Sequence, residues 1–215
     1  MTSADSVEDF FAAVTEGQTD VVRAMLDQEP ALLAAMALSG VRAPLIALYN
    51  EHDALADELA ARSAPLDVHE SSAFDDNGRL RTVLRENPGA VRAWSLDGWQ
   101  PLHLASFFGR TEAARQLLDE DAEVNSHSRN PSRATPLHCA TAGRHSEVVW
   151  LLIGSGADVS ARQEHGLTPL HTAAAKADAE SVRALLAAGA DPDAVDANGA
   201  SARMLAPPEI AALLG

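Results

Sequence analysis

A six-residue motif recurs at nearly constant spacing, and this repeat restricts the possible folds more than any other feature. It reads Gln-Pro-Leu-His-Leu-Ala at 100–105, Thr-Pro-Leu-His-Cys-Ala at 135–140 and Thr-Pro-Leu-His-Thr-Ala at 168–173. The prolines of successive copies are 35 and then 33 residues apart. A fixed period in the range of about 20–50 residues is typical of stacked structural repeats. The chain is therefore expected to fold as an array of similar units.

Each unit predicts a helix, a turn and a second helix. Thr135 and Thr168 suit helix N-caps, because the proline that follows each one can occupy the first helical position, where no N–H is needed. Gly156 and Gly189 suit the left-handed residue that ends the second helix. Alanine, the strongest helix former, makes up about a fifth of the chain. An all-α fold follows from these features.

Weaker copies flank the three clear ones. A fourth, eroded copy begins near Asn198, and its Ala202 takes the proline position. Three degenerate copies precede residue 97, at about 10–26, 43–60 and 66–84, and the gap before the last of them is too small for a full intervening hairpin. Because each unit buries its apolar face only against a neighbour, the copies should stack into one elongated body.

Residues 97–197 resemble three ankyrin repeats, whose units open with Gly-x-Thr-Pro-Leu-His and close with Gly-Ala-Asp-Val-Asn. A tetratricopeptide array has a similar period but lacks this helix start. The resemblance implies an all-α ankyrin-repeat solenoid of about six helix-turn-helix repeats with short β-turn fingers. We expect a single domain, 1–215, with three degenerate repeats in 1–96, three well-matched repeats in 97–197 and a truncated C-terminal cap in 198–215.

The histidines do not predict a metal site. His103, His138 and His171 occupy one position of successive units, where the resemblance implies a hydrogen bond to neighbouring backbone that ties repeats together. Packed helices lie about 8–10 Å apart, whereas zinc ligands lie about 2 Å from the ion. Cys139 suits a small buried apolar position. Since no nucleophile elbow, phosphate-binding loop or His-Glu-x-x-His motif is present, we expect no metal, no cofactor and no enzymatic activity.

The charge balance restricts the partner. Sixteen Lys and Arg against thirty-one Asp and Glu give a net charge of −15, which argues against nucleic acid or an anionic membrane as partner. The single cysteine allows no intramolecular disulfide, so the cytoplasm is the simplest expected location. We also expect a monomer. We expect a protein–protein interaction module. An acidic inhibitor of a basic enzyme is the alternative, and an enzyme or a fragment of a larger assembly are weaker ones.

The resemblance also implies where a partner would bind, because ankyrin arrays form a cupped hand with the fingers at one edge and the first helices as the palm. Positions beside the turn glycine and at the end of the first helix are free of structural duty. In repeats four to six, together with the two arginines of the longer connection at 127–134, these positions give the following predicted contacts: Leu96, Asp97, Trp99, Phe107, Phe108, Arg129, Arg133, Glu164, His165, Leu167 and Lys176.

Two of these assignments leave alternatives open. Phe107 or Phe108 could instead pack inward against repeat three, near Phe74 and Trp94. Arg129 and Arg133 could form a clamp for a carboxylate, or could belong to a solvated loop that pairs with local acidic groups.

Overall fold

The computed structural model describes residues 4–63 and 65–215, and it consists of helices in helix-turn-helix pairs. Short 3-10 helices occupy Pro30–Ala34, Pro88–Arg92 and Glu164–Gly166. The pairs are α1 (Ala4–Thr15) with α2 (Thr19–Gln28), α3 (Ala43–Tyr49) with α4 (Asp53–Arg62), α5 (Val68–Ala73) with α6 (Asn77–Glu86), α7 (Pro101–Phe107) with α8 (Thr111–Asp119), α9 (Pro136–Ala142) with α10 (Ser146–Gly154), α11 (Pro169–Ala175) with α12 (Ala179–Ala187), and α13 (Ala202–Leu205) with α14 (Pro208–Ala211).

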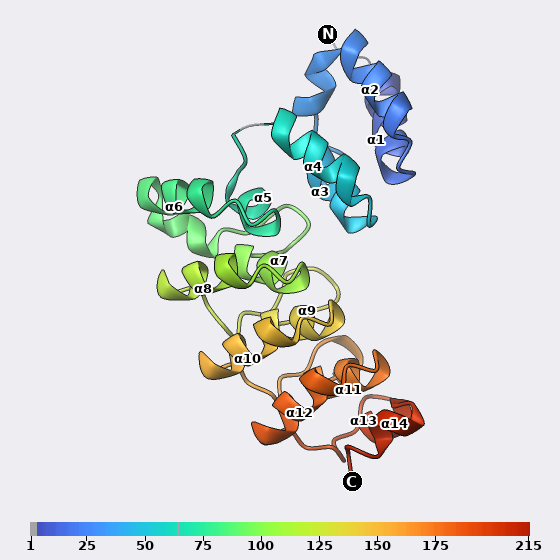
Figure 1. The fold of residues 1–215 in the computed structure, drawn as a ribbon, viewed down its shortest axis with the longest axis vertical. Coiled ribbons are helices and arrows are strands. Elements are labelled where there is room, and N and C mark those ends of the chain that lie inside the picture. Colours follow the sequence, from blue (N-terminus) through green and yellow to red (C-terminus); the bar gives the residue numbers. More distant parts are fainter. Residues whose placement is uncertain (1–3, 64) are drawn as a thin grey trace.

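The pairs stack in chain order from one end of the molecule to the other (Figure 1). The inner helices α5, α7, α9 and α11 form one row, and the outer helices α6, α8, α10 and α12 form a second row beside it. The prediction of an all-α solenoid with six repeats and a truncated cap is confirmed. In the described part of the chain, no helix is both long enough and apolar enough to cross a bilayer.

The helix starts follow the predicted capping. The Thr135 hydroxyl accepts a hydrogen bond from the His138 N–H, and the Thr135 N–H donates to His138 Nδ1 at 3.3 Å. The Thr168 N–H makes the same contact with His171 Nδ1 at 3.2 Å. Because threonine and histidine satisfy two otherwise unpaired groups, the motif sets where α9 and α11 begin.

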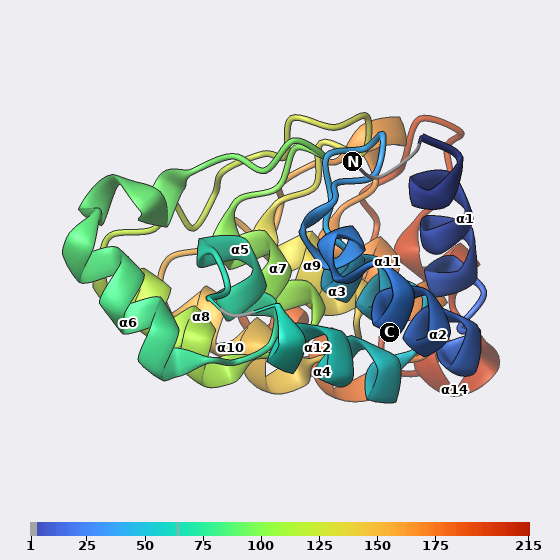
Figure 2. The ribbon, with the colours of Figure 1, turned by 90° about the horizontal axis from the view of Figure 1, so that it is seen from above.

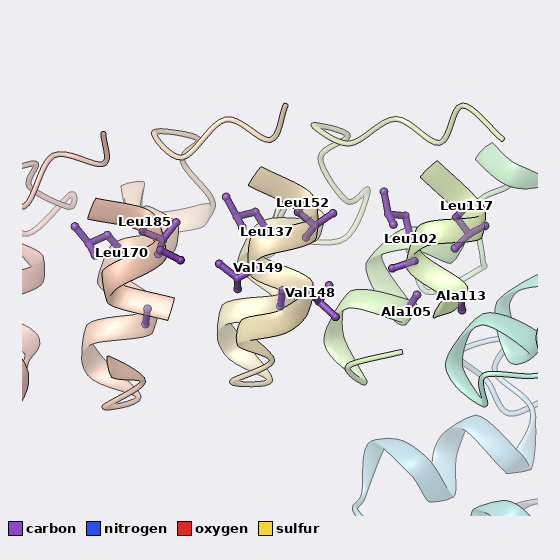
Figure 3. Packing of buried hydrophobic residues seen from close by; sticks show 14 of the residues in the cluster. Leu102, Ala105, Ala113, Leu117, Leu137, Val148, Val149, Leu152, Leu170 and Leu185 are labelled. Atoms are coloured by element: carbon purple, nitrogen blue, oxygen red, sulfur yellow. The ribbon is translucent and has the colours of Figure 1, made fainter. Parts of the chain in front are cut away.

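The core repeats with the same period as the sequence. Within each of three successive pairs, one leucine from the inner helix and one from the outer helix are almost fully buried and lie in one layer (Figure 3). A second cluster, around α1 to α4, also includes Ala73 of α5 and Leu104 of α7. The leucines of the three layers are Leu102 with Leu117, Leu137 with Leu152, and Leu170 with Leu185.

The segments that precede the inner helices form fingers on one side of the stack (Figure 2). We name them by the repeat that they open: the second finger (36–42), the fourth (94–100), the fifth (126–135), the sixth (161–168) and the cap finger (194–201). From the fourth finger onward, neighbours are joined by backbone hydrogen bonds. These run from the Arg129 N–H to the Gly98 carbonyl at 2.9 Å, from Glu164 to Ser132 at 2.8 Å, and from Ala197 to His165 at 2.8 Å.

The third repeat has no finger, because only residues 63–67 connect α4 to α5. In its absence, the fourth finger packs directly against the second. Gly40, with φ of +75°, lies so close to Leu96 that a Cβ at this position would be 2.3 Å from Leu96 Cδ1. Figure 1 shows α4 displaced from the row of outer helices that begins with α6. The short connection therefore interrupts the regular stack after the second repeat.

Asp121 occupies the helix-closing position that Gly156 and Gly189 take in the next two repeats, and its φ is +61°. A residue with a side chain is strained in this left-handed region. We expect Asp121→Gly to raise the free energy of unfolding by about 1 kcal/mol in urea denaturation. The neighbouring Glu120, with φ of −97°, provides the control. Glu120→Gly should not stabilise the protein, and equal effects of the two changes would contradict the strain at Asp121.

Candidate functional site

The three repeated histidines link each repeat to the next. His103 Nε2 lies 3.0 Å from the Ser126 carbonyl and 3.1 Å from the Ala134 carbonyl, both in the fifth finger. The equivalent nitrogens of His138 and His171 lie 3.0 and 3.1 Å from carbonyl groups of the sixth finger and the cap finger. Each imidazole therefore donates to the following finger while its Nδ1 faces the start of its own helix. The predicted structural role of these histidines is confirmed.

Burial keeps two of these imidazoles neutral, since it lowers the pKa of His103 and of His138 to about 4. Only a neutral ring offers one nitrogen as acceptor and the other as donor, as this geometry requires. Within the described residues, no three His, Cys, Asp or Glu side chains are grouped so that they could hold a metal ion.

An apolar cavity of about 400 Å³ opens on the concave side of the stack, between the inner helices α3, α7 and α9 and the fourth and fifth fingers. Trp99, Leu104 and Phe107 contribute much of its apolar lining, and Cys139 lies on its α9 side. We call it the palm cavity. Its shape and lining suit a large apolar side chain, because ligand pockets combine apolar walls with a few polar groups. The polar groups here are Asp97, Ser132, Gln163, His103 and His138.

Tyr49, the last residue of α3 in the second repeat, also lines the palm cavity. Its hydroxyl donates to Asp97 Oδ2 at 3.1 Å, and the Ser95 hydroxyl donates to Asp97 Oδ1. Burial, followed by the negative charge of Asp97, raises the pKa of Tyr49 well above its ordinary value. The Tyr49 side chain is therefore a neutral phenol, and its hydrogen bond to Asp97 links the second repeat to the fourth finger.

The two adjacent phenylalanines have different surroundings. Phe107 remains 39% exposed and lines the palm cavity. Phe108 is half-buried and stacks on Tyr49, with the ring centroids 5.6 Å apart. Phe108 therefore packs inward, as one of the two alternatives stated, but it packs against Tyr49 of the second repeat rather than against the third repeat. Of the pair, only Phe107 is accessible to a partner from the palm cavity.

Arg129 contacts an aromatic ring and, among the described residues, forms no ion pair with a local acidic group. Its guanidinium lies 4.3 Å from the centre of the Trp94 ring, in a cation–π contact rather than an ion pair. Arg133 is exposed with φ of +49°, and its carbonyl accepts a hydrogen bond from the His127 ring. These contacts within the fifth finger and with Trp94 add to its hydrogen bonds with the neighbouring fingers and with His103.

The remaining predicted contacts lie outside the palm cavity. Leu96 is 76% exposed at the tip of the fourth finger. Glu164, His165 and Lys176 are exposed in repeat six, and Leu167 there is partly buried. Asp97, Trp99 and Phe107 are thus the predicted contacts that the structure brings together around one cavity. Leu104, Cys139 and above all Tyr49 were missed; the one available signal was that Tyr49, the single tyrosine, also ends an inner helix, as Phe107 does.

Stacked helix pairs with a concave face, protruding fingers and a histidine link in three successive repeats define a class of repeat protein that presents a binding surface. The family model for ankyrin repeats (3 copies) matches residues 10–163 and 127–196, which together are most of the chain. The chain belongs to the ankyrin repeat family.

Curated relatives share short segments with this chain. It is 47% identical over 72 residues to human neurogenic locus notch homolog protein 4, covering 32% of this chain and 3% of that protein. Mouse Rabankyrin-5 is 38% identical over 72 residues, covering 33% and 6%. Alpha-latrocrustotoxin-Lt1a from Latrodectus tredecimguttatus is 34% identical over 97 residues, covering 45% and 7%. The chain therefore spans less than a tenth of the length of these relatives.

Proposed function

We propose that this ankyrin-repeat protein, a protein–protein interaction module by family, binds its partner by seating an apolar side chain in the palm cavity. The observation that carries the proposal is the grouping of Trp99, Phe107 and Tyr49 around one apolar cavity on the concave face. Exposed residues of repeat six extend the same surface. A monomer in a reducing compartment such as the cytoplasm fits the single, buried Cys139.

Two physical features support this binding mode. Interface hot spots are enriched in Trp and Tyr that lie in pockets from which a partner excludes water. The cavity is also built from helices and hydrogen-bonded fingers, so little conformational freedom is lost when a partner binds. A few contacts in the palm cavity can therefore supply most of the affinity.

The test combines Trp99→Ala with Phe107→Ala. A partner captured from cell extract by the wild-type protein should bind this variant about thirtyfold or more weakly, because loss of a hot spot costs about 2 kcal/mol or more. Affinity is measured by biolayer interferometry with the purified partner, and circular dichroism checks that the variant is folded.

Trp150 gives a matched control, since it is 49% exposed on the outer helix α10. Trp150→Ala also removes an exposed aromatic residue, but on another face, and should leave the affinity unchanged. If the Trp150 variant lost the partner and the palm variant kept it, the palm cavity would not be the binding site.

The net charge of −15 supports a second candidate, an acidic inhibitor that blocks a basic enzyme cleft. Such a complex would form mainly through charge, so its affinity should fall steeply as salt is added. An interface centred on the palm cavity should be much less sensitive. Measuring the dissociation constant across a salt series separates the two candidates.

A further inference from the structure

A second cavity lies where the third finger would otherwise be. It has a volume of about 210 Å³ and opens between the second and fourth fingers, beneath the contact of Gly40 with Leu96. Asp97 lines both this cavity and the palm cavity, so the two are neighbours. We call it the interfinger cavity. The residues that matter for its chemistry are Arg42, Asp67, His69, Glu70, Trp94 and Asp97.

Glu70 has one carboxylate oxygen without a partner. It occupies the third position of its inner helix, where His103 stands in α7, and its side chain is only 1% exposed. Oε2 accepts hydrogen bonds from Arg42 Nη1 at 2.7 Å and from the Asp67 N–H at 3.1 Å. Oε1 is buried and has no hydrogen-bond partner among the described residues. Because buried polar atoms are almost always paired, this oxygen marks a place for an additional donor.

The charges around the cavity favour a cationic donor. Its described lining holds the carboxylates of Asp67, Glu70 and Asp97 but one guanidinium, that of Arg42. His69 does not add a free donor toward Glu70, since its Nε2 donates to the Ala93 carbonyl at 3.1 Å. Burial, followed by the charge of Asp67, raises the pKa of Glu70, whereas Arg42 acts in the opposite direction.

Trp94, which lines the interfinger cavity, also favours a cationic ligand. Arg129 already lies 4.3 Å from the centre of the Trp94 ring, so this indole accepts a cation in its present surroundings. A volume of about 210 Å³ also exceeds that of a single lysine or arginine side chain, so a long basic side chain can enter.

We propose that the interfinger cavity takes the lysine or arginine side chain of a protein partner, with its cationic head donating to Glu70 Oε1. This inference rests on the proposed function: the same partner segment places an apolar residue in the palm cavity and a nearby basic residue in the interfinger cavity. Asp97, which lines both, fixes the two side chains as near neighbours in the partner.

The experiment selects binders from a displayed library of random dodecapeptides against the wild-type protein. We expect enrichment of a large apolar residue with lysine or arginine close by. For a selected peptide, replacing the basic residue by norleucine should weaken binding to the wild-type protein about tenfold, as expected for a hydrogen bond to a charged group. The same replacement should have little effect on binding to Glu70→Gln.

Two further variants show whether a lost preference for a basic residue reflects the interfinger cavity or a folding defect. Asp67→Asn removes a neighbouring charge but retains the side-chain oxygen that caps α5, and it should also reduce the preference for a basic residue. Glu58→Gln is the matched control, because it makes the same chemical change in another Arg–Glu pair, that of Arg23 on the outer helices, at 2.7 Å. This control should retain the full preference.

The outcomes separate this inference from the proposed function. Apolar enrichment without a basic residue, equal affinity of the norleucine peptide, or a basic preference that survives in both Glu70→Gln and Asp67→Asn would overturn the interfinger site and leave the palm cavity standing. If the selected peptides ignored the Trp99 and Phe107 substitutions, or if no peptide were enriched, both would be contradicted.

Discussion

The free energy of unfolding is expected to fall by about 3 kcal/mol for each of His103 and His138 as the pH drops from 6.5 to 4. In the folded protein the pKa of both imidazoles is about 4, whereas the ordinary value is 6.5. Between these values the unfolded chain binds protons that the folded chain does not, so acid favours unfolding. The contribution is fully present above pH 6.5 and is lost as the pH approaches 4.

Urea denaturation at several pH values, compared between the wild-type protein and His138→Gln, isolates this effect. The comparison is needed because protonation of surface carboxylates also changes the stability of a chain with a net charge of −15. Stability of the variant should depend less steeply on pH between 6.5 and 4. His165→Gln, at an exposed position in the sixth finger, should keep the wild-type dependence. Parallel pH profiles for the wild-type protein and His138→Gln would contradict the inter-repeat role of this histidine.

Leu152→Ala is expected to lower the free energy of unfolding by about 2–5 kcal/mol. Leu152 is fully buried in α10 and lies in the same core layer as Leu137 of α9 (Figure 3). Its loss removes apolar contacts and leaves a space that helices on both sides cannot fill without moving. Because each repeat is stabilised by its neighbours, the effect should extend beyond the fifth repeat.

Urea denaturation at pH 7, followed by circular dichroism, measures this loss. Leu38→Ala is the control, because Leu38 is fully exposed in the second finger and its removal should change stability by no more than about 0.5 kcal/mol. If the two substitutions had similar effects, the leucine layers would not form the main core.

Local sequence was sufficient for the repeating unit. The capping threonines, the prolines and the histidines act on groups within a few residues or on the adjacent finger, so the same motif produces the same contacts in each copy. The prediction that each unit buries its apolar face against a neighbour also agrees with the leucine layers of the structure. These predictions were correct because both depend on short-range geometry.

The candidate binding site was only partly predictable. Asp97, Trp99 and Phe107 could be proposed from their positions within one repeat, but Tyr49 contacts Asp97 from 48 residues away. Phe107 is the last residue of α7 and Phe108 is its C-cap, so their positions in the sequence left open which ring packs inward. Phe108 is the one that packs inward because Tyr49 of α3 lies against its ring.

The repeat motif in the sequence determined the helix pairs, their stacking and the hydrogen bonds of the buried histidines, because each of these repeats packs against a neighbour with the same motif. The two cavities have another origin. They arise where the third repeat lacks a finger and the second and fourth fingers come together: Tyr49 and Asp97 line one cavity, and Glu70 and Asp97 line the other. Contacts across such an irregular junction have no period in the sequence, because they depend on how two unlike repeats pack in three dimensions.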